Sequence, residues 1–167
     1  MKAYCRDGHV IATHDDEQNV PASAYGEGVT ILTLANGAVG AGDPLPDLDE
    51  GMLKGYARDK RNQVIAGGCV VTVDGLAIAS WADAQTQAAL TAIAVAAAAN
   101  PAFETTWKGR DGQFYEINAA DVSVLSQGVL AFVQAAFATE SAVVADIEAE
   151  NITDLDEIEA AAWPSNT

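Results

Sequence analysis

The sequence predicts an α+β fold: antiparallel β-hairpins with three to four helices, including one long C-terminal helix, preceded by a small β module. The pairs Asp7-Gly8, Asp74-Gly75 and Asp111-Gly112 each separate two extended runs. Asp-Gly in such a position indicates a hairpin, because a tight turn needs positive φ at both central residues. Two-residue turns exclude the crossovers of a parallel sheet. After Asn118, apolar residues recur every three or four positions, as on one face of a helix.

The small β module is expected at the N-terminus. Residues 3–6 and 9–13 flank the first Asp-Gly pair, and residues 29–34 form a further strand rich in β-branched side chains. Residues 37–47 then carry glycine and proline at short intervals, which is typical of a linker. The predicted boundaries are 1–36 for the small N-terminal β module, 37–47 for the Gly/Pro linker and 48–167 for the α+β main domain.

Two further hairpins are predicted in the main domain. Residues 69–73 and 76–79 pair around Asp74-Gly75, and residues 103–108 pair with residues 113–117. In the second hairpin, either a two-residue loop or a longer loop at 109–112 fits the sequence. Both registers remain open from the sequence alone.

Three shorter helices are expected between and after these strands. Asp49 is the predicted N-cap of the first helix, and Ser80 that of the second, which Asn100-Pro101 ends. The last helix starts at Thr153 or Asp154.

The long C-terminal helix is the main feature of the sequence. Its apolar residues recur from Val122 onwards, and some 30 residues give a rod of roughly 45 Å. That is longer than a 17.3 kDa chain needs to cover its own core, so we expect part of the helix to meet another chain. The alternative is a helix wrapped by its own domain on two sides. The expected contact residues are Phe132, Phe137, Val144 and Ile147.

Charge excludes several classes of partner. The 167 residues include 8 Lys and Arg against 24 Asp and Glu, which gives a net charge of -16. Nucleic acids and anionic membrane surfaces would repel such a chain. No run approaches the roughly 18 continuous apolar residues of a membrane span, and the N-terminus lacks the apolar segment of a signal peptide. We therefore expect neither nucleic acid nor membrane as a partner.

No pattern indicates catalysis, a cofactor or a metal. Cys5, His9 and His14 are close in sequence, but the predicted turn pairs Cys5 with Val10 and so points Cys5 and His9 to opposite sides of the sheet. Cys69 lies in an apolar strand, where cysteine is usually inert packing. The acidic run at 154–157 lacks the glycine of a calcium loop and suits a helix N-terminus. We expect no enzyme activity, no cofactor and no metal site.

Several short motifs resemble an uncharacterised domain family of short phage and prophage proteins, commonly encoded beside tail-fibre genes. The resemblance is clearest from about residue 50 to the end, and the N-terminal run at 4–14 is similar to the β module that often precedes this domain. The matching positions are Tyr56-Ala57-Arg58-Asp59-Lys60-Arg61, Gly67-Gly68, Val73-Asp74-Gly75, Ile78, Thr86-Gln87, Trp107-Lys108, Asp111-Gly112 and Ile158 to Pro164.

The resemblance implies a tail-fibre-associated protein and supplies no catalytic residues. Its usual role would be a tail-fibre assembly chaperone or accessory that binds the fibre protein, a trimer. The expected location is the host cytoplasm during assembly, the virion tail, or both, and retention in the mature virion is left open. The alternative is a permanent structural component of the fibre or baseplate. A homo-oligomer is also compatible with the long helix.

The N-terminal module is expected to dock on the fibre. Two or three strands are too few to bury a core alone. The expected contact residues are Tyr4, Ile11, Val29 and Ile31. The alternative is that the module packs on the main domain of its own chain.

Overall fold

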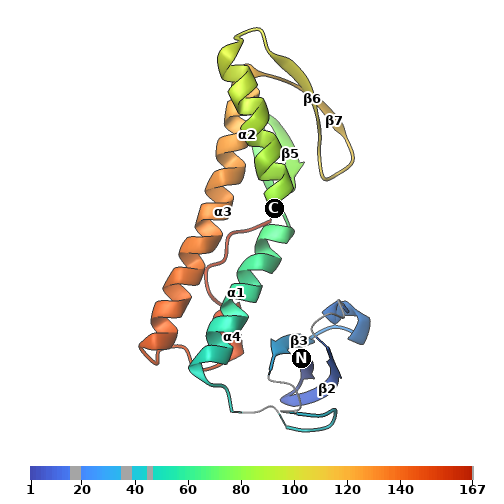
Figure 1. The fold of residues 1–167 in the computed structure, drawn as a ribbon, viewed down its shortest axis with the longest axis vertical. Helices are drawn as coiled ribbons and strands as arrows, with labels where there is room; N and C mark the ends of the chain where they lie inside the picture. The colour runs from blue at the N-terminus through green and yellow to red at the C-terminus, as the bar shows by residue number, and fades with distance from the viewer. Residues whose placement is uncertain (16–19, 35–38, 45–46, 167) are drawn as a thin grey trace. The chain divides into compact units, whose positions relative to one another are not determined.

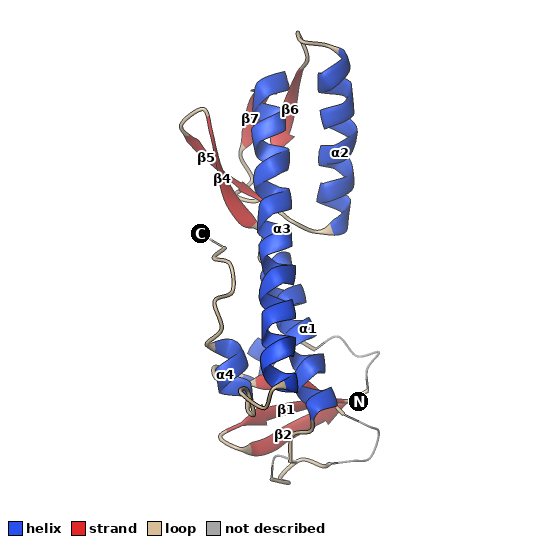
Figure 2. Cartoon of the chain, turned by 90° about the vertical axis from the view of Figure 1, so that its left-hand side faces the viewer, coloured by secondary structure: helices blue, strands red, loops and turns tan. Residues whose placement is uncertain are grey.

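A computed structural model describes residues 1–15, 20–34, 39–44 and 47–166 of the chain. Within these residues the fold is α+β, with all strand pairs antiparallel, as the sequence predicts (Figures 1 and 2). The elements in chain order are β1 (Lys2–Arg6), β2 (His9–His14), a 3-10 helix (Ala22–Tyr25), β3 (Thr30–Thr33), α1 (Glu50–Ala66), β4 (Cys69–Val73), β5 (Leu76–Ser80), α2 (Ala84–Ala99), β6 (Glu104–Lys108), β7 (Phe114–Asn118), α3 (Ala119–Glu148) and α4 (Leu155–Glu159).

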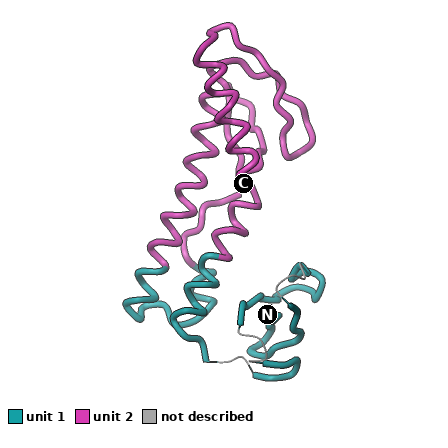
Figure 3. Tube along the Cα trace, in the orientation of Figure 1, with its two compact units in different colours: residues 1–58, 144–160 teal, residues 59–143, 161–167 magenta. Residues whose placement is uncertain are grey.

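The chain divides into two compact units (Figure 3). The first unit combines Met1–Arg58 with Val144–Ala160, and the second combines Asp59–Val143 with Ala161–Thr167. Helices α1 and α3 therefore contribute residues to both units. The predicted domain boundaries stay a prediction, and residues 37–38 and 45–46 of the predicted linker lie outside the described residues.

The first unit is built on a three-stranded sheet in the order β2-β1-β3. Asp7 and Gly8 have φ values of 50° and 76°, so the first predicted tight turn is confirmed. The sheet buries one apolar face together with partly buried residues of α1, α4 and the segment before α1. This core consists of Ala3, Cys5, Val10, Leu32 and Leu34, with Met1, Val39, Leu48, Met52, Tyr56 and Leu155 packed against it.

The second unit contains the hairpins β4–β5 and β6–β7. Asp74 and Gly75 have φ values of 46° and 79°, which confirms the second tight turn. In the third hairpin, the Gly109 amide donates to the Gln113 carbonyl at 2.8 Å, and Gly112 has a φ of 84°. The loop therefore comprises residues 110–112, because Lys108 pairs with Phe114 and Gly109 bonds Gln113. Neither the two-residue loop nor the loop at 109–112 is formed, since either would place Gln113 opposite a different residue.

Aspartate side chains cap the N-termini of three helices. The Met52 amide donates to Asp49 Oδ1 at 2.8 Å, as predicted, and Asp154 forms a capping box with Glu157 at the start of α4. The prediction of Ser80 as the cap of α2 is wrong. Asp83 is the N-cap, accepting from the Thr86 amide at 2.7 Å.

Ser80 cannot serve as that cap because it is the last residue of β5. It pairs with Cys69, and its hydroxyl donates to the Trp81 carbonyl at 2.9 Å.

The core of the second unit gathers around one face of α3. Val122, Leu125 and Val129 are fully or almost fully buried there, so the predicted helical period is confirmed. Gly128 lies on the same helix against Val71 of β4. Helix α2 runs antiparallel beside the first half of α3 (Figures 1 and 2).

Candidate protein-binding surfaces

The thiols and imidazoles show the placement that the predicted register requires. Cys5 pairs with Val10, and Arg6 pairs with His9, so the predicted register is confirmed. Both cysteines are buried and free; burial raises the pKa of Cys5 to about 11 and also raises the pKa of Cys69. Over the described ranges, no three side chains of His, Cys, Asp or Glu gather as a metal-binding group.

The predicted N-terminal contact residues differ in exposure. Tyr4 is 0% exposed, its hydroxyl donates to the Val20 carbonyl at 2.5 Å, and its ring packs against His14 and Tyr25. Tyr4 is thus a core residue of the first unit. The remaining members of the set are half-buried, namely Ile11, Val29 and Ile31.

The predicted contact residues on α3 also separate into two groups. Phe132 and Ile147 are buried in the structure, and Val144 is half-buried. Phe137 is 50% exposed. The Arg61 guanidinium lies 4.4 Å from the centre of the Phe137 ring and forms an ion pair of 2.5 Å with Glu140. Of this set, Phe137 is the residue most open to a partner.

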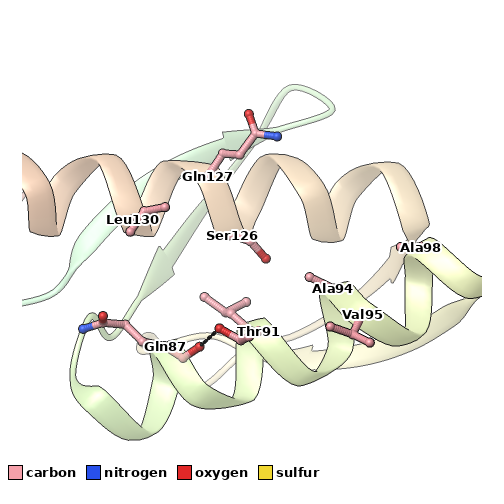
Figure 4. A pocket seen from close by; sticks show the side chains of 9 residues that line it. Gln87, Thr91, Ala94, Val95, Ala98, Ser126, Gln127 and Leu130 are labelled. Carbon is pink, nitrogen blue, oxygen red and sulfur yellow. Dashed lines mark hydrogen bonds between the residues drawn. The ribbon is translucent and has the colours of Figure 1, made fainter.

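An apolar groove runs between α2 and α3 in the second unit. Its cavity volume is about 420 Å³ (Figure 4). The Ser126 hydroxyl points from α3 into the space between the helices and is buried without a hydrogen-bond partner. The α2–α3 groove is lined by Gln87, Leu90, Thr91, Ala94, Val95 and Ala98 of α2 and by Ser126, Gln127 and Leu130 of α3.

Two large apolar side chains on the walls of the groove remain open to solvent. Val95 is 68% exposed and Leu130 is 50% exposed. Helix α2 contains no ionisable side chain, and α3 has none between Asp121 and Glu140. This neutral surface therefore belongs to a chain whose net charge is -16.

Sequence reasoning missed the α2–α3 groove. Alanine occupies every side of α2, so the apolar pattern does not distinguish a buried face from an exposed one. The signal that was available is the absence of charge over two helices of a strongly acidic chain.

Helix α3 is also long and apolar enough to cross a membrane by length and composition. Its most apolar 18-residue window has a mean hydropathy of 1.6, and 28% of that window is buried. Core helices of globular proteins pass the same test. The expectation of no membrane partner therefore stays a prediction.

Open strand edges form a second candidate surface. Among the described residues, the β4–β5 and β6–β7 sheets each consist of two strands, so each strand has one edge without a neighbouring strand. The outer face of the β6–β7 hairpin carries Phe114, which is 70% exposed. Since hydrogen-bonded pairs alternate along an antiparallel ladder and Gly109 bonds Gln113, the amides of Thr106 and Glu116 point to the outer edges.

The comparisons with known proteins give a family and no function. Neither curated proteins nor solved structures yield a match. Residues 52–162 match the family described as Domain of unknown function (DUF4376). This match covers more than half of the chain, and the chain therefore belongs to the DUF4376 family.

Proposed function

We propose that this protein is a bacteriophage tail-fibre assembly chaperone that binds the fibre protein through the open edges of its hairpins. The observation that carries this proposal is the two-stranded state of both sheets in the second unit. The resemblance of the sequence to short proteins encoded beside tail-fibre genes supports the choice of partner.

Strand addition is the physical basis of the proposal. A fibre built from intertwined β-chains folds slowly, because its contacts are distant in sequence, and its unpaired strands tend to aggregate. An edge with free amides and carbonyls can pair with such a strand and protect it. Because the chaperone carries a net charge of -16, it also keeps the complex soluble.

The β6–β7 hairpin has the features that this pairing needs. Each of its strands has five residues, and both carry charged side chains on the exposed face. On the inner face, Trp107 and Tyr115 pack against the core of the second unit and hold the hairpin in place. The outward amides of Thr106 and Glu116 are then free to donate to an added strand.

Co-expression of the proposed tail-fibre partner with and without this chain tests the function. We expect soluble fibre trimer to depend on the chaperone. Thr106→Pro and Glu116→Pro remove one outward amide each without breaking a ladder bond, because proline is tolerated where the amide faces outward. Each variant should lower trimer yield, whereas the matched variants Thr106→Val and Glu116→Gln should not.

Two outcomes would contradict parts of the proposal. Equal trimer yield with and without the protein removes the chaperone role. Purified virions then test the alternative: a fixed ratio of this protein to fibre, together with chaperone-independent trimer, would make it a permanent structural component of the fibre or baseplate.

A further inference from the structure

We propose that the α2–α3 groove is a self-association surface, on which a second copy of this chain docks through its own α2 and α3. The inference is independent of fibre binding, because it rests on the neutral helices of the second unit and not on the strand edges.

Charge selects a second copy as the occupant. Two chains of net charge -16 repel one another wherever their carboxylates face each other. The α2 helix and α3 between Asp121 and Glu140 have no ionisable side chain, so this surface brings no like charges into contact. A basic partner would instead gain most from the acidic surfaces of the chain.

Shape makes the surface self-complementary. It offers two projecting side chains, Val95 and Leu130, and a hollow between the small residues Ala94, Ala98 and Ser126. In a two-fold arrangement, the projecting residues of each copy enter the hollow of the other, so both contacts form twice. Small residues along α2 also let the helix backbones approach closely.

The available area matches a weak dimer. The 16 residues of α2 extend over about 24 Å, and two adjacent helices are about 20 Å wide. The face therefore covers on the order of 500 Å² on each copy, or about 1,000 Å² in total, which is the lower limit for a specific interface. We expect a dimer that forms and dissociates with concentration.

Salt dependence distinguishes this dimer from one held by ion pairs. Raising the ionic strength from about 0.01 M to about 0.15 M shortens the screening length from roughly 30 Å to roughly 8 Å. Because the proposed contact is neutral and the rest of each copy is acidic, added salt should strengthen association. An interface that depends on salt bridges would weaken instead.

Sedimentation velocity on the full chain, from about 1 µM to about 1 mM, tests the proposal. Val95→Glu places a carboxylate in the neutral contact and should weaken dimerisation at least tenfold. Leu76→Glu is the matched control, because Leu76 is 60% exposed on β5, outside the groove, and the charge change is identical. Circular dichroism verifies that both variants fold.

A covalent test places the contact directly. Val95→Cys should give a cross-linked dimer with a short bis-maleimide, and Leu76→Cys should not. The native thiols of Cys5 and Cys69 are buried and should not react with the maleimide.

A chain that stays monomeric up to the highest concentration and salt overturns the inference. A dimer unaffected by Val95→Glu also overturns it, since another surface would then be in use. If the wild-type chain is monomeric and binds the fibre, and the Val95→Glu variant does not bind it, the groove holds the fibre and not a second copy. The proline variants of β6 and β7 distinguish the two proposals: a lowered yield of fibre trimer with unchanged dimerisation would show that the strand edges and the groove act separately.

Discussion

The close approach of α3 to β4 predicts that Gly128→Ala destabilises the protein, although alanine is the better helix former. A Cβ atom at Gly128 would lie 2.6 and 2.7 Å from the two methyl carbons of Val71. Ordinary carbon–carbon contacts are about 3.5–4.0 Å. Val71 is 9% exposed and β-branched, so every rotation about χ1 leaves at least one of its two methyl groups facing Gly128.

The expected magnitude is a difference between two terms. Overpacking by one methyl group costs about 1–3 kcal/mol. Replacing glycine by alanine inside a helix contributes about 1 kcal/mol in the opposite direction. The net effect of Gly128→Ala is therefore a loss of about 1 kcal/mol in the free energy of unfolding, or roughly 2–4 °C in melting temperature.

The assay is urea unfolding followed by circular dichroism for four proteins: wild type, Gly128→Ala, Val71→Ala and the double variant. In the Val71→Ala background, the added methyl group occupies vacated space, so Gly128→Ala should stabilise by up to about 1 kcal/mol. The coupling between the two sites is then about 2 kcal/mol. Gly55→Ala in α1 is the matched control, because its Cβ would meet nothing within 4 Å.

The reasoning is refuted if Gly128→Ala and Gly55→Ala stabilise the protein equally. That result would mean that α3 does not pack on β4 as closely as described. Simple additivity of the Gly128 and Val71 substitutions would lead to the same conclusion.

Three further predictions concern a cap, an ion pair and the thiols. Asp83→Ala should lower the free energy of unfolding by about 1 kcal/mol at neutral pH. The hydrogen bond from the Thr86 amide holds the pKa of Asp83 below its ordinary 3.8, so this contribution is complete above about pH 4 and is lost as the pH falls through the lowered pKa. The urea midpoints of variant and wild type should therefore converge in acid. Arg61→Ala should lower the free energy of unfolding by about 2 kcal/mol. A double-mutant cycle with Glu140→Gln, measured by urea unfolding, should show that most of this loss depends on the ion pair between the two side chains. A colourimetric thiol reagent should detect neither Cys5 nor Cys69 in the native protein and both after unfolding; fast native reaction would contradict their burial.

Features that depend on local chemistry could be predicted from the sequence. Asp7-Gly8 and Asp74-Gly75 form tight turns because their φ values are set by the residues themselves. The period of α3 was also readable, since its buried face carries large side chains such as Val122 and Leu125. Asp154 was among the expected starts of α4 because its side chain reaches an amide three residues on.

Features that depend on partners distant in sequence could not be predicted. Ser80 and Asp83 are both good caps, and the pairing of Ser80 with Cys69 across the hairpin decides between them. The loop after β6 is set by a bond from the Gly109 amide to the Gln113 carbonyl across the hairpin, a pairing that neither predicted register contained. The α2–α3 groove requires two helices to meet, and no pattern within α2 indicates which of its sides faces α3.

The division of the chain into compact units has a consequence for its synthesis. Each unit is discontinuous: the first needs Val144–Ala160 and the second needs Ala161–Thr167. Near the end of the chain, Asn166 donates through Nδ2 to the carbonyls of Val64 and Gly68, 102 and 98 residues earlier. Domains that are continuous in sequence can fold one after another as they leave the ribosome. Here the first unit cannot close before Val144–Ala160 has emerged, and the second unit also needs residues after Ala160. A nascent chain stalled before residue 144 therefore has no complete unit to protect it from proteases.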